Sequence, residues 1–243
     1  MTSPRPKPDR DASLAELEAE PTAIPDFARE AADAGRAHAV GRGDALVAVA
    51  YDLMTRAGLE GLTVRAVLKQ AGVNRRAFYE RFSGKDDLVL AVFEQSLQSL
   101  AAQCRELIAA KGDPLERLRY IVHAIVLGIP ADGADPVPNI RRGAALCREH
   151  MRLAESRPED LRLALRPLIA LLAENLADGV ACGQVRDRAP EVLASLVYNL
   201  VSTTVHAEVL AQEAGAPARP SRARLADEIW EFCRGGVAAT PWS

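Results

Sequence analysis

A cluster of basic side chains is the part of this sequence with the clearest chemical potential. Between Leu62 and Lys85 a single acid, Glu80, is opposed by six cations: Arg65, Lys69, Arg75, Arg76, Arg81 and Lys85. Arginine presents a planar fork of N–H donors that fits phosphate oxygens and the O6 and N7 acceptors of guanine. Although the formal net charge of the whole chain is −3, this local basic face predicts contact with nucleic acid.

Two short helices are predicted to position these side chains. Thr63 is a good N-cap for a helix over residues 64–71, and Gly72 supplies the turn that follows. Asn74 can cap a second helix from Arg75 to about Arg81. This spacing is typical of a helix-turn-helix, whose second helix enters the major groove of DNA. The side chains expected on the groove-facing side are Asn74, Arg75, Arg76, Ala77 and Tyr79.

Longer helices are expected on either side of this motif. Apolar residues recur at helical spacing from Leu46 to Ala57, and Gly58 and Gly61 would end that helix. After the motif, Ser83 and Asp86 have the spacing of a capping box, which predicts the start of a long helix continuing to about Leu107.

The run from Thr63 to Leu88 resembles the tetracycline-repressor (TetR) family over about residues 42–93. The family pattern is a capped helix, Ala-Gly-Val, a short helix with Phe-Tyr, a second Phe and a Lys-acid pair. Here it is carried by Ala71-Gly72-Val73, Phe78-Tyr79, Phe82 and Lys85-Asp86. The resemblance implies that Thr63, Tyr79 and Lys85 contact phosphates, which leaves Arg75 and Arg76 as candidate base readers.

Two positions depart from the family pattern. Arg76 stands where members often have Gly or Pro, and Arg81 stands where they often have His or Tyr. Both changes add positive charge, so they favour DNA binding. Arg76 nevertheless puts any operator preference inherited from the family in doubt.

The fold is predicted to be all-α. Aromatic residues make up only 5% of the chain, and no strand pattern is present. A three-helix DNA-binding domain with the helix-turn-helix is expected over residues 42–90, followed by a helical bundle over 91–243. Helices in the bundle are predicted near 114–128, 139–155, 159–183, 189–213 and 221–236.

The first part of the chain, residues 1–41, is predicted to be a flexible arm. Prolines interrupt it, and only short helices, such as one over Asp26–Ala39, fit between them. Arg36 and Arg42 could reach a DNA backbone or minor groove, but a disordered tail is the favoured interpretation.

The helical bundle is expected to serve two purposes. Helices over 114–183 would enclose a pocket for a small, mostly apolar effector. Its candidate polar lining is Tyr120, His123, Asn139, Arg142, Cys147, His150, Asn175, Tyr198 and His206, of which Tyr120, His123, Cys147, His150, Asn175 and Tyr198 are the ligand-binding residues we favour. The last two helices carry apolar stripes suited to a homodimer through an intermolecular four-helix bundle: Leu193, Leu196, Leu200, Thr203, Ala207 and Leu210, then Leu225, Ile229, Phe232, Cys233 and Gly236.

Several other functions are disfavoured. The four cysteines form no CxxC pair, so neither a structural metal site nor a disulfide framework is expected, although Cys147 and His150 could share a metal as a minor alternative. No catalytic constellation, cofactor loop, secretory signal or membrane span is apparent. A cytoplasmic protein that needs no cofactor is expected. The Arg-rich, Lys-poor composition suggests a GC-rich bacterial genome.

The favoured function is a sequence-specific regulator of transcription. The resemblance implies a homodimeric repressor that binds a palindromic operator in double-stranded DNA and is released by a small ligand. Two alternatives remain. One is a DNA-binding activator or architectural protein without an effector. The other is a helical enzyme or protein-interaction module whose basic stripe meets an acidic partner.

Overall fold

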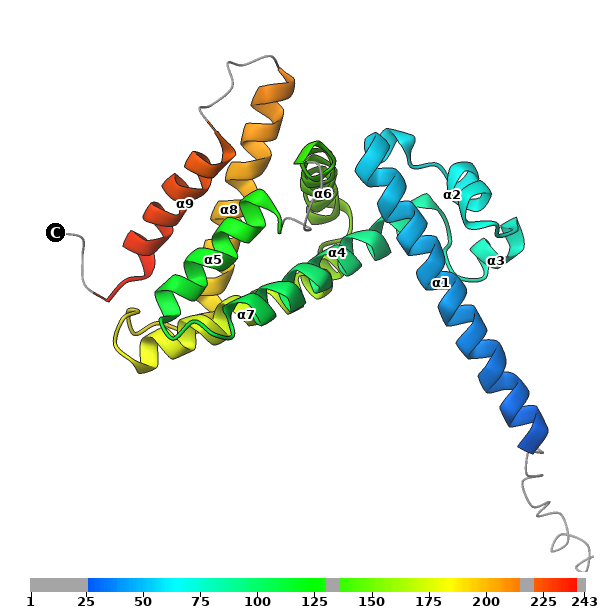
Figure 1. Cartoon of the computed structure of the whole chain (residues 1–243), viewed down its shortest axis with the longest axis horizontal. Helices are drawn as coiled ribbons and strands as arrows, with labels where there is room; N and C mark the ends of the chain where they lie inside the picture. The colour runs from blue at the N-terminus through cyan, green and yellow to red at the C-terminus, as the bar shows by residue number, and fades with distance from the viewer. Residues whose placement is uncertain (1–25, 130–135, 215–220, 240–243) are drawn as a thin grey trace, which may run out of the picture. The chain divides into compact units, whose positions relative to one another are not determined.

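The computed structural model describes residues 26–129, 136–214 and 221–239. The side chains that it describes begin at residue 43 and leave out residues 136–142, 144 and 213. Within these ranges the chain is helical and has no strand, as predicted (Figure 1). The helices are α1 (Asp26–Gly61), α2 (Val64–Ala71), α3 (Arg75–Tyr79), α4 (Lys85–Ile108), α5 (Pro114–Leu127), α6 (Pro136–Ser156), α7 (Pro158–Ala181), α8 (Pro190–Glu213) and α9 (Arg222–Val237).

Helix α1 differs most from its expected bounds. It begins at Asp26, not near residue 42, because the segment after Pro25 is rich in alanine and free of proline. The boundary between two compact units, residues 1–42 and 43–243, falls within it. At its other end Gly58 adopts φ 66°, a left-handed conformation that breaks the helical geometry as predicted. The side chains of Arg36 and Arg42 lie outside those described.

The caps of α2 and α3 confirm the predicted helix-turn-helix. Thr63 Oγ1 accepts a hydrogen bond from the Ala66 amide at 3.1 Å, and Asn74 Oδ1 accepts one from the Ala77 amide at 2.9 Å. Between the two helices Gly72 has φ 66° and ψ 25°, which costs glycine little and a residue with a Cβ atom more. The turn geometry therefore follows from local sequence alone.

The predicted start of α4 was wrong in its details. Helix α4 begins at Lys85 after an N-cap at Gly84, and Gly84 has no side chain to make a capping bond. Instead, Asp87 Oδ2 accepts from the Ser83 amide at 3.0 Å, so Asp87 takes the role expected of Asp86. Because the N-cap is Gly84 and not Ser83, the third residue of the helix is Asp87 and not Asp86.

Two hydrophobic cores meet along α4. The first joins α1, α2 and α3 around Phe78, which is fully buried, and it includes Leu88 and Val92 of α4. The second fills the space between α4, α5, α7, α8 and α9, and it takes Phe93 and Leu97 from the same helix. Because one continuous helix contributes to both cores, a displacement of α4 must change the packing of both.

Helices α5 to α9 lie close to their predicted bounds. Helix α7 packs between α4 and α8, while α9 packs against α5 (Figure 1). Pro167 lies inside α7, which runs on without a break from Pro158 to Ala181. None of the helices in the described ranges is long and apolar enough to cross a membrane.

Candidate DNA-binding face and ligand cavity

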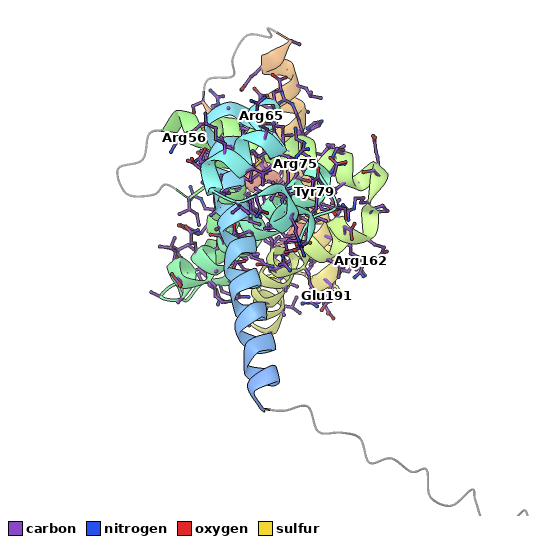
Figure 2. The ribbon with its side chains drawn as sticks, turned by 90° about the vertical axis from the view of Figure 1, so that its right-hand side faces the viewer. Arg56, Arg65, Arg75, Tyr79, Arg162 and Glu191 are labelled. Atoms are coloured by element: carbon purple, nitrogen blue, oxygen red, sulfur yellow. The ribbon has the colours of Figure 1, made fainter. Side chains whose placement is uncertain are left out.

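The outer side of the α2–α3 motif carries the basic side chains singled out from the sequence. Arg65, Arg75 and Tyr79 lie on the same exposed side of the motif (Figure 2). Thr63, Asn74 and Arg76 are exposed as well, while Ala77 is half-buried. On the opposite side of α3, Phe78 is fully buried. Burial of Phe78 therefore orients the short helix so that its cations face solvent.

Thr63 and Asn74 combine two roles. Each uses its side-chain oxygen to cap a helix, yet the Thr63 hydroxyl proton and the Asn74 amide protons stay available to donate. Both side chains are exposed at the helix starts, where free backbone N–H groups favour anions. They can thus donate to phosphate oxygens without giving up the caps.

Tyr79 and Lys85 are held in place by contacts on their inner sides. The Tyr79 ring packs edge-on against Phe78 with ring centroids 5.2 Å apart, and the rest of the Tyr79 side chain is exposed to solvent. Lys85 Nζ donates to the Leu59 carbonyl oxygen at 2.9 Å. An ammonium group has three donors, so two remain for a phosphate. Both residues are positioned before any DNA arrives.

Arg75 and Arg76 differ in their freedom. Arg76 Nε forms an ion pair with Glu80 Oε1 at 3.1 Å, one turn along the helix. Arg75 is exposed and has no ion-pair partner within the described part of the chain. Since Glu80 competes for the Arg76 guanidinium, Arg75 is the stronger of the two candidate base readers.

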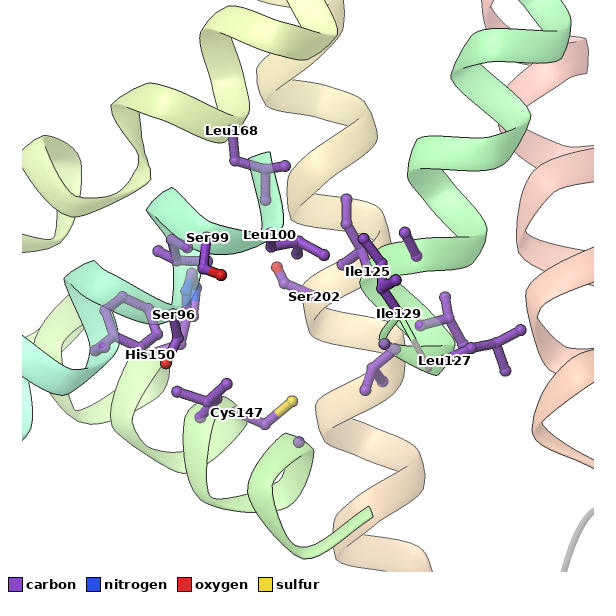
Figure 3. Close-up of a pocket in the computed structure, with 18 of the residues that line it drawn as sticks. Ser96, Ser99, Leu100, Ile125, Leu127, Ile129, Cys147, His150, Leu168 and Ser202 are labelled. Carbon is purple, nitrogen blue, oxygen red and sulfur yellow. The ribbon is translucent and has the colours of Figure 1, made fainter. Parts of the chain in front are cut away.

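A cavity of about 280 Å³ lies inside the helical bundle. Figure 3 shows Ile125, Leu127 and Ile129 on one side of it and His150 on the other. Its wall is mostly apolar, with a few neutral polar groups, which is the composition typical of sites for small organic ligands. The lining comes from more helices than the predicted 114–183, because α4 contributes Phe93, Ser96, Leu97, Ser99, Leu100 and Gln103 and α8 contributes Tyr198, Ser202 and Val205.

The structure brings together three of the six ligand-binding candidates. Cys147, His150 and Tyr198 line the cavity, whereas Tyr120, His123 and Asn175 do not. The Asn175 amide is buried and donates to the Leu171 carbonyl at 2.7 Å, so the helix itself uses its polar group. His123 lies beside Asp227 of α9, with Nε2 to Oδ1 at 3.4 Å. His206 is also absent from the lining, and the side chains of Asn139 and Arg142 lie outside those described.

His150 and Tyr198 form a polar pair at the cavity wall. The Tyr198 hydroxyl and His150 Nδ1 are 3.1 Å apart. Burial disfavours the imidazolium and nearby His206 adds like charge, so the pKa of His150 lies below its ordinary 6.5. Burial raises the pKa of Tyr198 well above its ordinary value. At neutral pH the pair is therefore uncharged.

The low pKa of His150 makes the stability of the protein depend on pH. The unfolded chain takes up a proton near pH 6.5, where the buried imidazole does not, so the free energy of unfolding falls as the pH drops below that value. We expect the His150→Gln variant to show a smaller fall between pH 7 and pH 5 in urea titrations. An equal pH dependence in the variant and the wild type would contradict this. His123, whose pKa is also lowered, contributes in the same direction in both proteins.

Several residues that line the cavity were not predicted from the sequence. Ser96, Ser99 and Gln103 follow a spacing of three and four on α4, which places them on one helical face. That spacing was the available signal. Tyr51 of α1 and Arg222 of α9 also line the cavity, and no local pattern marks either residue. Only packing of distant helices brings them to this wall.

Cys147 and His150 both line the cavity, one turn apart on α6. Among the described residues, no group of three histidine, cysteine, aspartate or glutamate side chains could hold a metal ion. Burial raises the pKa of the Cys147 thiol, which favours the protonated form. The two side chains therefore serve as neutral wall groups.

The apolar stripes of α8 and α9 divide between the core and the surface. Leu193, Leu225, Ile229 and Cys233 are buried within the chain, so the prediction that they face a partner was wrong. The side chains left outside are Val192 at 57% exposure, Leu196 at 61%, Leu210 at 48% and Phe232 at 70%. Large apolar side chains that remain exposed on two helices packed against each other are typical of an interaction surface.

Two arginines tie the start of α4 to the body of the bundle. Arg157 Nη1 donates to Asp87 Oδ1 at 2.8 Å, and its Nε contacts Asp160. Hydrogen bonds with Ser83, and then the hydrogen bond from Arg157, hold the pKa of Asp87 below its ordinary value. Arg152 pairs with the buried Glu149 and lies 3.7 Å from Asp86. The helix that lines the cavity is thus joined electrostatically to α6 and α7 next to the DNA-binding motif.

Comparison with known proteins agrees with this geometry. Residues 46–92 match the family model described as bacterial regulatory proteins, tetR family. The HTH-type transcriptional repressor KstR2 of Mycobacterium tuberculosis is 24% identical over 183 residues, covering 71% of this chain and 82% of that protein.

Solved structures share the fold over most of the chain. A TetR-family transcriptional regulator from Pectobacterium atrosepticum superposes with a TM-score of 0.66 at 19% identity, covering 85% of this chain and 99% of that one. The regulator FadR from Bacillus subtilis, solved in complex with stearoyl-CoA, gives a TM-score of 0.60 at 17% identity, covering 79% and 97%. The predicted all-α fold is therefore confirmed, and the family whose model matches residues 46–92 is the one that the sequence resembles.

Proposed function

We propose that this chain, whose residues 46–92 match the model of the tetR family of bacterial regulatory proteins, is a homodimeric repressor released from its operator by a small ligand. The observation that carries the proposal is the conjunction of an exposed basic α3 with an apolar cavity lined by α4, the helix that follows the DNA-binding motif. Repression is also the activity named for the relative KstR2.

Operator binding follows from the side chains around α3. Arg75 reads a base edge, while Thr63, Tyr79 and Lys85 donate to phosphates and set the register of the motif on the duplex. Asn74 and Ala77 lie at the start of α3, where the helix approaches the groove. Because one short helix spans few base pairs, a second copy is required for a specific site.

The second copy binds through a surface on α8 and α9. Leu196 and Phe232 are the most exposed large apolar side chains of the described residues, and both lie on these helices. A two-fold axis through this surface pairs each patch with its own copy and buries both. The two copies of α3 can then bind the two half-sites of one palindromic operator.

Release depends on the double role of α4. A ligand in the cavity touches Phe93 and Leu97, whereas Leu88 and Val92 of the same helix pack in the core of the DNA-binding motif. Tyr51 of α1 reaches the cavity as well. A ligand that fits better to a displaced α4 shifts the population toward a state in which the two α3 helices no longer match the operator. FadR of Bacillus subtilis, with stearoyl-CoA bound, shows that this fold can hold an acyl chain.

A gel-shift titration on the promoter of the protein's own or the adjacent gene tests the proposal. We expect a retarded complex that survives excess sheared DNA and weakens steeply with rising salt. No retardation at low or moderate salt, from protein that is folded and dimeric, would sink the repressor proposal.

The same assay tests the dimer through Leu196→Glu. A carboxylate in the centre of the α8–α9 surface should convert the dimer to a folded monomer, with loss of the retarded complex. Leu107→Glu is the matched control, since Leu107 is 49% exposed on α4 and lies outside this surface. Sedimentation of both variants gives the oligomeric state. A Leu196→Glu protein that remains dimeric would show that the dimer interface lies outside the α8–α9 surface.

A further inference from the structure

Among the described residues that line the cavity, only Arg222 has a charged side chain. Besides Arg222, the lining consists of apolar side chains, glycines, hydroxyls, an amide, a thiol and an imidazole that burial keeps neutral. Arg222 is the first residue of α9 and is half-buried. Burying part of a guanidinium costs free energy unless an acceptor compensates for the lost water.

Arg222 lacks the acceptor that its neighbours have. Arg224, two residues further along α9, pairs with Glu228 at 3.1 Å on the outer surface. Arg119, which faces α9 from α5, pairs with Asp227 at 3.4 Å. Across the parts of the chain that the structure describes, no carboxylate pairs with Arg222.

The guanidinium lies against the α6 wall of the cavity. A Cβ atom built on Gly143 would be 3.6 Å from Arg222 Nη1, an ordinary contact distance, so the guanidinium lies directly beside this residue of α6. The positive charge of Arg222 also lowers the pKa of Cys147, against the larger effect of burial. This agrees with a guanidinium beside Gly143, which lies one turn before Cys147 on α6. Gly143 and His150 are separated by about two helical turns, roughly 10 Å along α6.

The charged and the uncharged polar groups of the cavity wall are separated. The cation lies beside Gly143, and the uncharged His150–Tyr198 pair lies about two helical turns further along α6. Ile125, Leu127 and Ile129 form an apolar wall (Figure 3). A ligand that satisfies every part of this lining has an apolar body and an anionic group at one end.

We propose that the cavity takes an amphipathic carboxylate, whose carboxylate group pairs with Arg222 beside Gly143 and whose hydrocarbon body lies along the α5 wall. The carboxylate fits because its two oxygens accept two parallel N–H bonds from a guanidinium. This inference rests on the proposed function for its biological meaning, since it names the class of effector. The pairing itself can be measured without DNA.

Calorimetric titration of the full-length protein with decanoate, decan-1-ol and decylammonium tests the charge preference at constant chain length. At pH 7 we expect decanoate to bind at least about tenfold more tightly than the alcohol, and the ammonium to bind more weakly than either. In the Arg222→Met variant decanoate should fall to the level of the alcohol, and Arg222→Lys should retain part of the difference. Arg224→Met is the matched control and should behave as wild type.

The outcomes separate this inference from the regulator proposal. Decanoate that binds no better than decan-1-ol, or that binds Arg222→Met as well as wild type, would refute the anionic class, as would failure of decanoate to bind at all. If the same protein still retards operator DNA, the regulator proposal stands alone. Conversely, Arg222-dependent decanoate binding in a protein that retards no DNA would support the anion site and remove the regulator.

Discussion

Replacing Arg75 with alanine should weaken operator binding by about 1–3 kcal/mol per half-site, roughly 5- to 150-fold, and relax the base preference at one position of each half-site. The reason is that Arg75 is exposed on α3 and has no ion pair in the described structure, so its fork of donors is free for a guanine edge. Fluorescence anisotropy with the operator and with single-base variants measures both effects.

Two comparisons distinguish base reading from general attraction. Tyr79→Phe removes only a hydroxyl, so it should weaken binding to all sequences by a similar factor without changing the base preference. Arg162→Ala removes an exposed arginine of α7 that pairs with Glu159 and lies away from the motif (Figure 2), and it should have little effect. If Arg75→Ala weakens specific and non-specific DNA equally, Arg75 contacts a phosphate and not a base.

Replacing Phe78 with alanine should lower the free energy of unfolding by about 3–5 kcal/mol and abolish operator binding. Phe78 is fully buried and packs against Phe82, with ring centroids 5.6 Å apart, in the core that joins α1, α2 and α3. Loss of the ring leaves a cavity at the point where α3 is oriented. Urea titration followed by circular dichroism gives the change in stability.

Tyr79→Ala provides the matched comparison, because it truncates the next aromatic side chain on the same helix. Tyr79 is 53% exposed, so the cost should stay near the roughly 0.5–1.5 kcal/mol of its edge-on contact with Phe78. Operator binding should nevertheless weaken, at least as much as in Tyr79→Phe, because the phosphate contact is removed. A Phe78→Ala protein as stable as Tyr79→Ala would show that the motif does not depend on this core.

The DNA-binding motif was predictable because its determinants are local. Thr63 and Asn74 each cap a helix whose first amides lie three residues away, and Gly72 supplies a backbone conformation that other residues resist. The buried Phe78 and the exposed Arg75 follow from helical periodicity. Local signals were less reliable at the start of α4, where the acceptor proved to be Asp87 instead of Asp86.

The ligand cavity was predictable only in kind. An apolar bundle with a few polar groups was expected, and Cys147, His150 and Tyr198 do line it. Asn175 was wrongly predicted to line the cavity, because a buried amide can donate its hydrogen bond to a backbone carbonyl on the preceding turn of its own helix. Likewise, an apolar stripe does not reveal whether it faces the core or a partner, which is why Leu193 and Leu225 proved to be buried within the chain.

The basic segment from Thr63 to Lys85 thus shows what sequence alone determined here: the all-α fold, the helix-turn-helix and the basic side chains that its second helix exposes. Each depends on capping and periodicity, which act over a few residues. Tertiary structure decided which candidates share a cavity, which apolar side chains remain outside, and that Arg222 of α9 meets Gly143 of α6. Those relations join residues far apart in the chain, and only the packing of whole helices brings them together.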